Sequence, residues 1–242
     1  MHRLNDSGPF WIDAQDSDLR FPDVALALRD PDGLLALGGD LSSERLLLAY
    51  RSGIFPWFGP DQPILWWSPD PRLVLFPASL RISRSLSRTL RARPFRITLD
   101  TAFSAVIEQC AARRKGQSGT WITPEMRASY ERLHREGYAH SVECWQGDEL
   151  VGGLYGVAIG RIFFGESMFT RVSDASKVAL VQLVQQLQAW DFPLIDCQVH
   201  TRHLQSLGAV AIPRAEFVQQ LAVHCTRPAV PGPWRLATPA GI

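Results

Sequence analysis

The chain has few cysteines and no long apolar run. Its four cysteines include no Cys-x-x-Cys pair, so we expect free thiols and neither a disulfide framework nor a zinc site. His200 and His203 lack helical i, i+4 spacing and a neighbouring carboxylate, so we predict no metal there. No apolar segment approaches the ~20 residues of a membrane helix, and residues 1–21 do not resemble a signal peptide. We therefore expect a cytoplasmic protein without a membrane partner.

Acidic residues are missing between Asp70 and Asp100, although the whole chain has a net charge of only +1. Arginines are frequent in the same segment. Local arginine enrichment in a nearly neutral chain predicts one specific anionic contact and not general adhesion to polyanions. The arginines are Arg72, Arg81, Arg84, Arg88, Arg91, Arg93 and Arg96.

Residues 80–92 are predicted to form a helix with one arginine face. Four arginines recur at steps of three, four and three residues, which places them within an arc of roughly 80° at ~100° per residue. Arginine binds phosphate through its bidentate fork, so we interpret this face as a nucleic acid contact. A solvated basic face would usually interleave acidic residues, and a membrane-surface helix would carry a larger aromatic face. The arginines are Arg81, Arg84, Arg88 and Arg91, and the opposite face carries Ile82, Leu86 and Leu90.

The composition changes near residues 69–71, after a segment rich in glycine, proline and tryptophan. We predict a small N-terminal α/β domain over residues 1–70 and a second domain over residues 71–242. In the first domain, Ser42 or Ser43 can cap a helix that ends at Gly53. The fold class predicted for the whole chain is α+β.

The second domain is predicted to be an acetyltransferase-like, GNAT-related mixed α/β domain. Residues 140–146, 149–159 and 161–169 read as an antiparallel meander with tight turns. A helix from Asp174, a strand over 194–198 and two further helices follow, an order that suits this fold by analogy. Earlier elements are strands at 72–76 and 95–99 and helices at 102–113 and from 123 or 124 to before 137.

The stretch LIDCQ places Asp196 and Gln198 two positions apart in an apolar strand, so their side chains should share one face. Burying a carboxylate is costly unless it is hydrogen-bonded. Glu166 sits in another apolar run, FFGESMF, where it either reaches solvent at a strand end or lines a pocket. In a pocket, both carboxylates would need partners, and a cationic substrate could be one.

Trp57 and Trp121 lie in turn-rich contexts, where they either pack in the core or stack on nucleic acid bases. An acetyltransferase would need a glycine-rich turn at a helix N-terminus to hold the pyrophosphate of coenzyme A. No glycine occurs between Gly165 and Gly208. We therefore predict an acyl donor carried on nucleic acid and not on coenzyme A.

Several motifs occur together in one order: GLLALGGDLS, GIFPWF, ILWWSPDPR, GTWIT, ELVGGLYGV, GESMF, ASK, LIDCQ and SLGA. Over about residues 21–222 this set resembles the bacterial leucyl/phenylalanyl-tRNA–protein transferase family. The resemblance implies transfer of leucine or phenylalanine from aminoacyl-tRNA to the N-terminal Arg or Lys of proteins, which creates an N-degron for proteolysis. It also implies a GNAT-like fold and no cofactor, and we expect a monomer.

The resemblance assigns roles to particular residues. Asp196, Gln198 and Glu166 would act at the catalytic centre, and Trp57 and Trp121 would hold the 3′-terminal adenosine. The aminoacyl pocket would be lined by Leu154, Phe163, Met168 and Leu183, and the tRNA acceptor stem would contact Arg84, Arg88 and Arg91.

In the expected reaction, the Gln198 carbonyl accepts a hydrogen bond from the attacking amine. Asp196 either takes a hydrogen bond from the Gln198 amide or meets the cationic acceptor. The proton could instead leave through the tRNA 2′-hydroxyl or water. Two other functions stay open from the residues: a tRNA-binding protein without transfer activity, and a small-molecule acetyltransferase.

Overall fold

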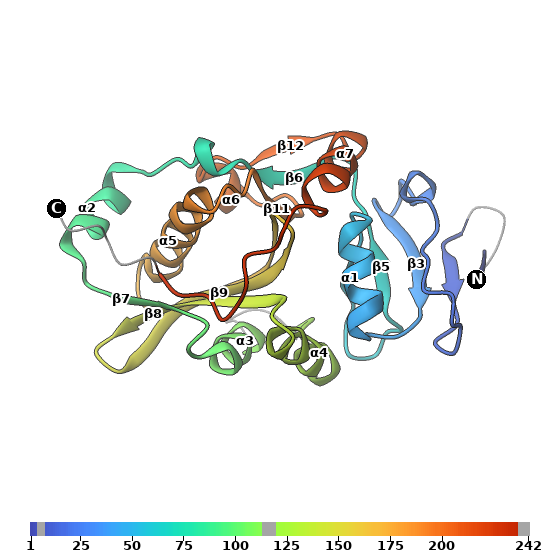
Figure 1. Ribbon diagram of the computed structural model, residues 1–242, viewed down its shortest axis with the longest axis horizontal. Coiled ribbons are helices and arrows are strands. Elements are labelled where there is room, and N and C mark those ends of the chain that lie inside the picture. Colours follow the sequence, from blue (N-terminus) through green and yellow to red (C-terminus); the bar gives the residue numbers. More distant parts are fainter. Residues whose placement is uncertain (4–7, 113–119, 237–242) are drawn as a thin grey trace.

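A computed structural model describes residues 1–3, 8–112 and 120–236. This part of the chain forms a mixed α/β structure with two β-sheets and seven α-helices (Figure 1). The predicted mixture of helices and strands is confirmed. None of the described helices is long and apolar enough to cross a membrane. The end of the predicted helix at Arg113, the Gly119 of the GTWIT motif and residues 237–242 lie outside the described residues.

The first sheet has five strands in the order β1-β2-β3-β5-β4. Helix α1, Ser43–Arg51, is capped by the Ser42 side chain, which accepts from Arg45 N. Gly53 follows with φ of 78°, a conformation that glycine adopts without strain. Both predicted ends of this helix are confirmed. The strands are β1 His2–Arg3, β2 Phe10–Ile12, β3 Leu34–Gly38, β4 Phe55–Pro56 and β5 Leu65–Trp67.

The second sheet has seven strands in the order β12-β6-β11-β10-β9-β8-β7. Strands β8, β9 and β10 form the predicted antiparallel meander, and β11 pairs parallel with β10. Strand β12 is missing from the sequence-based prediction because it has only three residues, two of them exposed. The strands are β6 Arg72–Leu75, β7 Arg96–Leu99, β8 Ala139–Gln146, β9 Glu149–Ile159, β10 Ile162–Thr170, β11 Leu194–Gln198 and β12 Val210–Ile212.

Helices α3 and α5 cover opposite faces of the second sheet (Figure 1). A Cβ on Gly152 would lie 2.6 Å from Ala175 of α5, whereas one on Gly153 would lie 3.3 Å from Val106 of α3. Neighbouring strand residues point to opposite faces, and glycine at both positions lets each helix approach the sheet closely. The remaining helices are α2 Arg84–Ala92, α3 Phe103–Ala111, α4 Pro124–Arg135, α5 Ala175–Ala189, α6 Arg202–Ser206 and α7 Arg214–His224.

The predicted arginine helix begins later than expected. Helix α2 starts at Arg84, after Ser83, whose hydroxyl accepts from Leu86 N at 3.2 Å. Arg81 lies before this cap, and its backbone N–H donates to Leu207 O at 2.9 Å. The placement of Arg81 on the helix is therefore wrong, because a serine N-cap and a contact with a distant loop hold it outside.

The core joins the two sheets. One cluster of buried residues contains side chains of both sheets, such as Trp66 of β5 and Phe164 of β10. Tyr50 of α1 belongs to the same cluster, and its ring centroid lies 5.0 Å from that of Phe164. Helix α5 buries an apolar stripe of Val178, Val181, Val184 and Leu187. The chain crosses from β5 to β6 between Trp67 and Arg72. The predicted boundary near residue 70 falls in this crossing, and the division into two domains stays a prediction.

Candidate functional site

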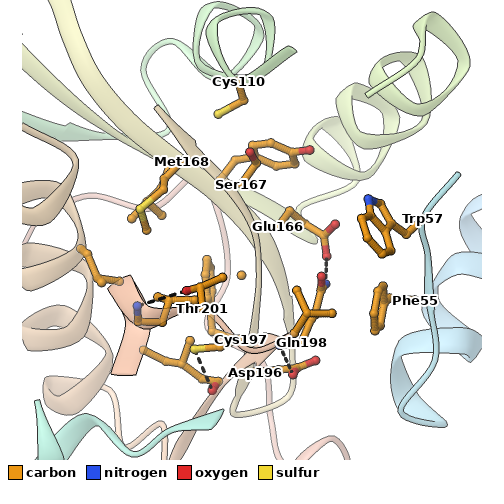
Figure 2. A pocket seen from close by; sticks show the side chains of 18 of the residues that line it. Phe55, Trp57, Cys110, Glu166, Ser167, Met168, Asp196, Cys197, Gln198 and Thr201 are labelled. Atoms are coloured by element: carbon orange, nitrogen blue, oxygen red, sulfur yellow. Dashed lines mark hydrogen bonds between the residues drawn. The ribbon is translucent and has the colours of Figure 1, made fainter. Parts of the chain in front are cut away.

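A cavity of about 520 Å³ opens where strands β10 and β11 part (Figure 2). Their parallel pairing ends at Phe164 and Asp196, and β10 has an irregular register between Gly165 and Ser167. The cavity brings together all of the predicted catalytic, aminoacyl-pocket and adenosine-binding residues. These are Glu166, Asp196, Gln198, Leu154, Phe163, Met168, Leu183, Trp57 and Trp121.

Glu166 is the centre of a hydrogen-bond cluster drawn from four elements. Its Oε1 accepts from Tyr50 Oη of α1 and from Gln198 Nε2 of β11, both at 2.7 Å. Its Oε2 accepts from Tyr130 Oη of α4 at 2.8 Å, and the two tyrosine oxygens lie 2.6 Å apart. The cluster therefore links helices before and after residue 70 to both strands of the cavity.

Burial sets the charge state of this cluster. It raises the pKa of Glu166 to about 7, although hydrogen bonds from Tyr50, Tyr130 and Gln198 act in the opposite direction. Burial and the nearby Glu166 carboxylate raise the pKa of both tyrosines well above 10. The tyrosines thus remain protonated donors at neutral pH, while Glu166 titrates close to it.

Asp196 forms a buried ion pair with Arg72, the first residue of β6. Arg72 Nε lies 2.8 Å from Asp196 Oδ1, and Arg72 Nη2 lies 2.7 Å from Oδ2. The guanidinium also donates to Gly53 O at 3.2 Å and sits between the rings of Phe55 and Phe217, 4.7 Å from each centroid. Asp196 is thereby neutralised within the protein. Arg72 contacts both carboxylate oxygens, so the charge of Asp196 is balanced without a cationic acceptor. The expected contact between Asp196 and the acceptor stays a prediction.

The predicted side-chain contact between Asp196 and Gln198 is wrong. The backbone N–H of Gln198, and not its amide side chain, donates to Asp196 Oδ1 at 2.9 Å. Gln198 has φ of 61°, and the β11–β6 register shifts between the two residues. This local distortion redirects the side chain, so that its amide reaches Glu166 across the cavity (Figure 2).

The Gln198 amide has a defined orientation. A carboxylate accepts hydrogen bonds and cannot donate them, so Glu166 in its ionised form selects the Nε2 group as its neighbour. Gln198 Oε1 accepts no hydrogen bond from the part of the chain that the structure describes. It can therefore accept a hydrogen bond from a bound amine or hydroxyl group.

The other end of the cavity is apolar. Met168 lies away from the Glu166–Gln198 contact, on the side nearer α5 (Figure 2). Leu154 of β9, Phe163 of β10 and Leu183 of α5 are buried there. Together with Leu180 they form a surface that suits an aliphatic or aromatic side chain.

The two predicted adenosine-binding tryptophans line the cavity. Trp57 is 44% exposed, and its backbone carbonyl accepts from Trp67 Nε1 at 2.7 Å. It follows strand β4 and faces Glu166 and Gln198 (Figure 2). Trp121, on the segment before α4, is partly buried. Trp66 instead belongs to the core, where it is fully buried and donates to Gly38 O at 2.9 Å.

The three helical arginines do not reach this cavity. Arg84, Arg88 and Arg91 lie on α2, whose underside buries Leu86. Among the described residues, none of the three has a carboxylate within ion-pair distance. Helix α2 contacts the start of α5 through a 3.1 Å hydrogen bond from Thr89 Oγ1 to Asp174 Oδ2.

Sequence reasoning missed Tyr50, Tyr130 and Arg72 as parts of the site. The tyrosines come from helices far apart in sequence, and nothing in their local patterns indicates a shared carboxylate. Arg72 carries a usable signal, because it begins a strand whose remaining residues are apolar and buried. A buried arginine and a buried aspartate in strands of one sheet are expected to pair.

Two family models match the chain. The leucyl/phenylalanyl-tRNA protein transferase model covers residues 74–222, and that family's N-terminal domain model covers residues 39–70. The solved structure of L-PGS from Bacillus licheniformis is only distantly similar. It has 9% identity and a TM-score of 0.39, covering 69% of this chain and 53% of that chain.

Curated relatives are much more similar. A leucyl/phenylalanyl-tRNA–protein transferase from Thiobacillus denitrificans is 60% identical over 88% of this chain and 94% of its own length. One from Aromatoleum aromaticum is 61% identical over 92% of this chain and 94% of its own length. One from Stutzerimonas stutzeri is 58% identical over 90% of this chain and 96% of its own length. The chain therefore belongs to the leucyl/phenylalanyl-tRNA–protein transferase family.

Proposed function

We propose that this protein is an aminoacyltransferase that moves leucine or phenylalanine from aminoacyl-tRNA to the N-terminus of a protein. Family membership supports the reaction. The main structural support for this activity is the cavity, in which an apolar end adjoins the cluster of Gln198, Glu166 and the two tyrosines. An aminoacyl side chain fits the apolar end, which leaves its ester carbonyl towards Gln198.

The chemistry needs orientation more than a strong base. The neutral α-amine of the acceptor attacks the ester carbonyl, a C–N bond forms, the C–O bond to the ribose breaks, and one amine proton ends on the released ribose oxygen. An α-amine has a reference pKa of about 7.7–8.0, so a useful fraction is neutral near pH 7. Gln198 Oε1 would accept from the attacking amine, and correct positioning can supply roughly 7–11 kcal/mol.

Glu166 and Asp196 would contribute in different ways. The Arg72–Asp196 ion pair would hold the Gln198 backbone in its bent conformation, because Asp196 Oδ1 accepts from Gln198 N. Glu166 would hold the Gln198 amide. Of the two carboxylates that line the cavity among the described residues, Asp196 has a cationic partner and Glu166 has neutral hydrogen-bond donors. The acceptor is proposed to carry an N-terminal Arg or Lys, as the resemblance of the sequence motifs to the family implies.

The tRNA would extend beyond the cavity. Trp57 and Trp121 would stack against the 3′-terminal adenosine at the opening, and Arg84, Arg88 and Arg91 would contact acceptor-stem phosphates. No metal or coenzyme enters the proposed reaction. The modified proteins would carry an N-degron for proteolysis, and the enzyme would act as a cytoplasmic monomer.

We also propose the acetyltransferase-like, GNAT-related fold for residues 71–242. The support is the element order, an antiparallel meander β8–β10, helix α5 and the parallel strand β11. The acyl cavity lies where β10 and β11 separate.

The test is a transfer assay with radiolabelled leucyl-tRNA and a protein that begins with Arg. Label in the acceptor protein supports the proposal, and the matched Nα-acetylated acceptor should remain unlabelled. An acceptor beginning with Glu tests the Arg or Lys preference. Binding of leucyl-tRNA without transfer of label would indicate a tRNA-binding adaptor and would overturn the proposed activity.

A further inference from the structure

The C-terminal segment, residues 225–236, extends beyond the region that the family models match. It runs from α7 across the second sheet toward β7 (Figure 1). Most of its residues are exposed, yet Trp234 is 1% exposed and is one of the largest fully buried side chains. A single buried tryptophan in an exposed segment indicates a specific anchor.

The Trp234 backbone is fixed by a buried carboxylate. Its N–H donates to Asp100 Oδ2 at 2.6 Å, and Asp100 also accepts from Ser141 N at 2.9 Å and contacts His140 Nδ1 at 2.8 Å. The indole N–H donates to Val230 O at 3.3 Å. The polar groups of the tryptophan are thus satisfied within the fold, as burial requires.

The indole ring fills an aromatic slot. It stacks on His140 with ring centroids 3.6 Å apart and planes 1° apart. Trp190 and Phe192 meet it edge-on at 5.0 and 6.2 Å. A further ring contact is with Phe163, whose ring centroid lies 6.0 Å away.

Phe163 connects this slot to the aminoacyl cavity. It is 1% exposed and lines the apolar end beside Leu154 and Leu183. Gly156 of the neighbouring strand also touches the ring, since a Cβ there would lie 2.5 Å from Phe163 Cζ. The Phe163 ring therefore packs between Gly156 and Trp234. Its position sets the depth of the apolar end of the aminoacyl cavity.

We propose that Trp234 is a positioning residue that holds Phe163 and thereby sets how well the cavity distinguishes leucine from phenylalanine. This inference rests on the proposed function. Without the indole, the Phe163 ring can move back and the apolar end becomes deeper. A leucine side chain would then no longer touch the wall, whereas the larger phenylalanine would still reach it.

The experiment compares kcat/KM for leucyl-tRNA and phenylalanyl-tRNA in the full-length protein and its variants. A missing methylene in an apolar pocket changes discrimination by about 10–200-fold, so we expect Trp234→Leu to lower the leucine-to-phenylalanine ratio about tenfold. Trp234→Phe keeps a ring in the slot and should give a smaller change in the same direction. The matched control is Ile12→Ala, a truncation of a buried residue in the first sheet.

A double-mutant cycle tests the route of the effect. If Trp234 acts through Phe163, then Trp234→Leu should no longer change the ratio in a Phe163→Leu background. An unchanged ratio in Trp234→Leu, or the same ratio change in Ile12→Ala, would overturn the inference. If Trp234→Leu does not fold, an unchanged ratio in Trp234→Phe overturns it. Absence of transfer by the wild-type protein refutes the proposed function instead.

Discussion

The side-chain amide of Gln198 donates to Glu166 Oε1 over 2.7 Å, although the two residues lie 32 positions apart on separate strands. Because this hydrogen bond uses Gln198 Nε2, the Oε1 atom of this cavity-lining residue is the proposed acceptor for the attacking amine. Two tyrosines hold Glu166 from the other side. The orientation of one amide thus depends on side chains from three other elements, β10, α1 and α4.

Gln198→Ala should lower the transfer rate about 10²–10³-fold, the usual cost of removing one preorganised polar group at a reacting centre. Binding of aminoacyl-tRNA should change little, because the apolar end and the tryptophans remain. Single-turnover transfer and filter binding measure the two quantities separately. Gln185→Ala, on the exposed side of α5, is the matched control. A full single-turnover rate in Gln198→Ala would rule out the assigned role.

Glu166→Gln should remove a pH dependence of stability. Burial raises the pKa of Glu166 from 4.5 to about 7. Between these values the unfolded chain has lost the proton while the folded chain keeps it, so the folded state loses stability as pH rises through this window. The full effect is on the order of 3 kcal/mol. Below pH 4.5 both states are protonated, and the contribution is fully present.

Urea unfolding of wild type and Glu166→Gln at about pH 4.5, 6 and 8 measures this effect. Other titrating groups contribute equally to both proteins, so the difference between the two curves isolates Glu166. We expect the wild type to lose stability relative to the variant as pH rises. Parallel curves would show that Glu166 ionises at its ordinary pKa in the folded protein.

Asp196→Asn should destabilise the fold by about 3–5 kcal/mol, because it leaves the buried Arg72 guanidinium without its counter-ion. The Arg72–Asp196 pair is almost fully buried on both sides. Asp18→Asn is the control, since it breaks an exposed pair with Arg20 and should change stability little. Urea midpoints compare the two variants. Equal, small shifts would contradict a structural role for the buried pair.

Much of the site could be predicted from sequence because several of its residues are polar or charged within apolar segments. Glu166 and Asp196 are carboxylates in apolar strands, and such residues need partners wherever they lie. Helix α1 was predictable at both ends from Ser42 and Gly53, whose preferences are local. The same holds for the turns of the β8–β10 meander.

The partners themselves were not predictable. Asp196 pairs with Arg72 across 124 positions, and Tyr50 reaches Glu166 across 116. Such pairs follow from sheet order and helix docking, which no local pattern contains. The bend at Gln198 has the same origin, since a non-glycine residue with φ of 61° gives no sequence signal. Strand alternation therefore predicted a contact between the Gln198 side chain and Asp196, whereas the amide contacts Glu166.

The arginine face of α2 gives the last prediction. Arg84, Arg88 and Arg91 have no carboxylate partner within the described part of the chain, so a bound phosphate would be their first counter-ion. Removing one arginine–phosphate pair should flatten the plot of log affinity against log salt by about one unit. Arg84→Ala, Arg88→Ala and Arg91→Ala combined should therefore reduce the salt slope of tRNA binding by up to about three units.

The control for this helix is Arg135→Ala, which removes an exposed arginine at the end of α4 and should leave the slope unchanged. Fluorescence titrations of leucyl-tRNA between low and physiological salt give the slopes directly. The triple variant should also keep its transfer rate once tRNA is saturating, because these arginines lie outside the cavity. An unchanged slope would mean that α2 presents only a solvated basic face, and that the acceptor stem contacts another surface.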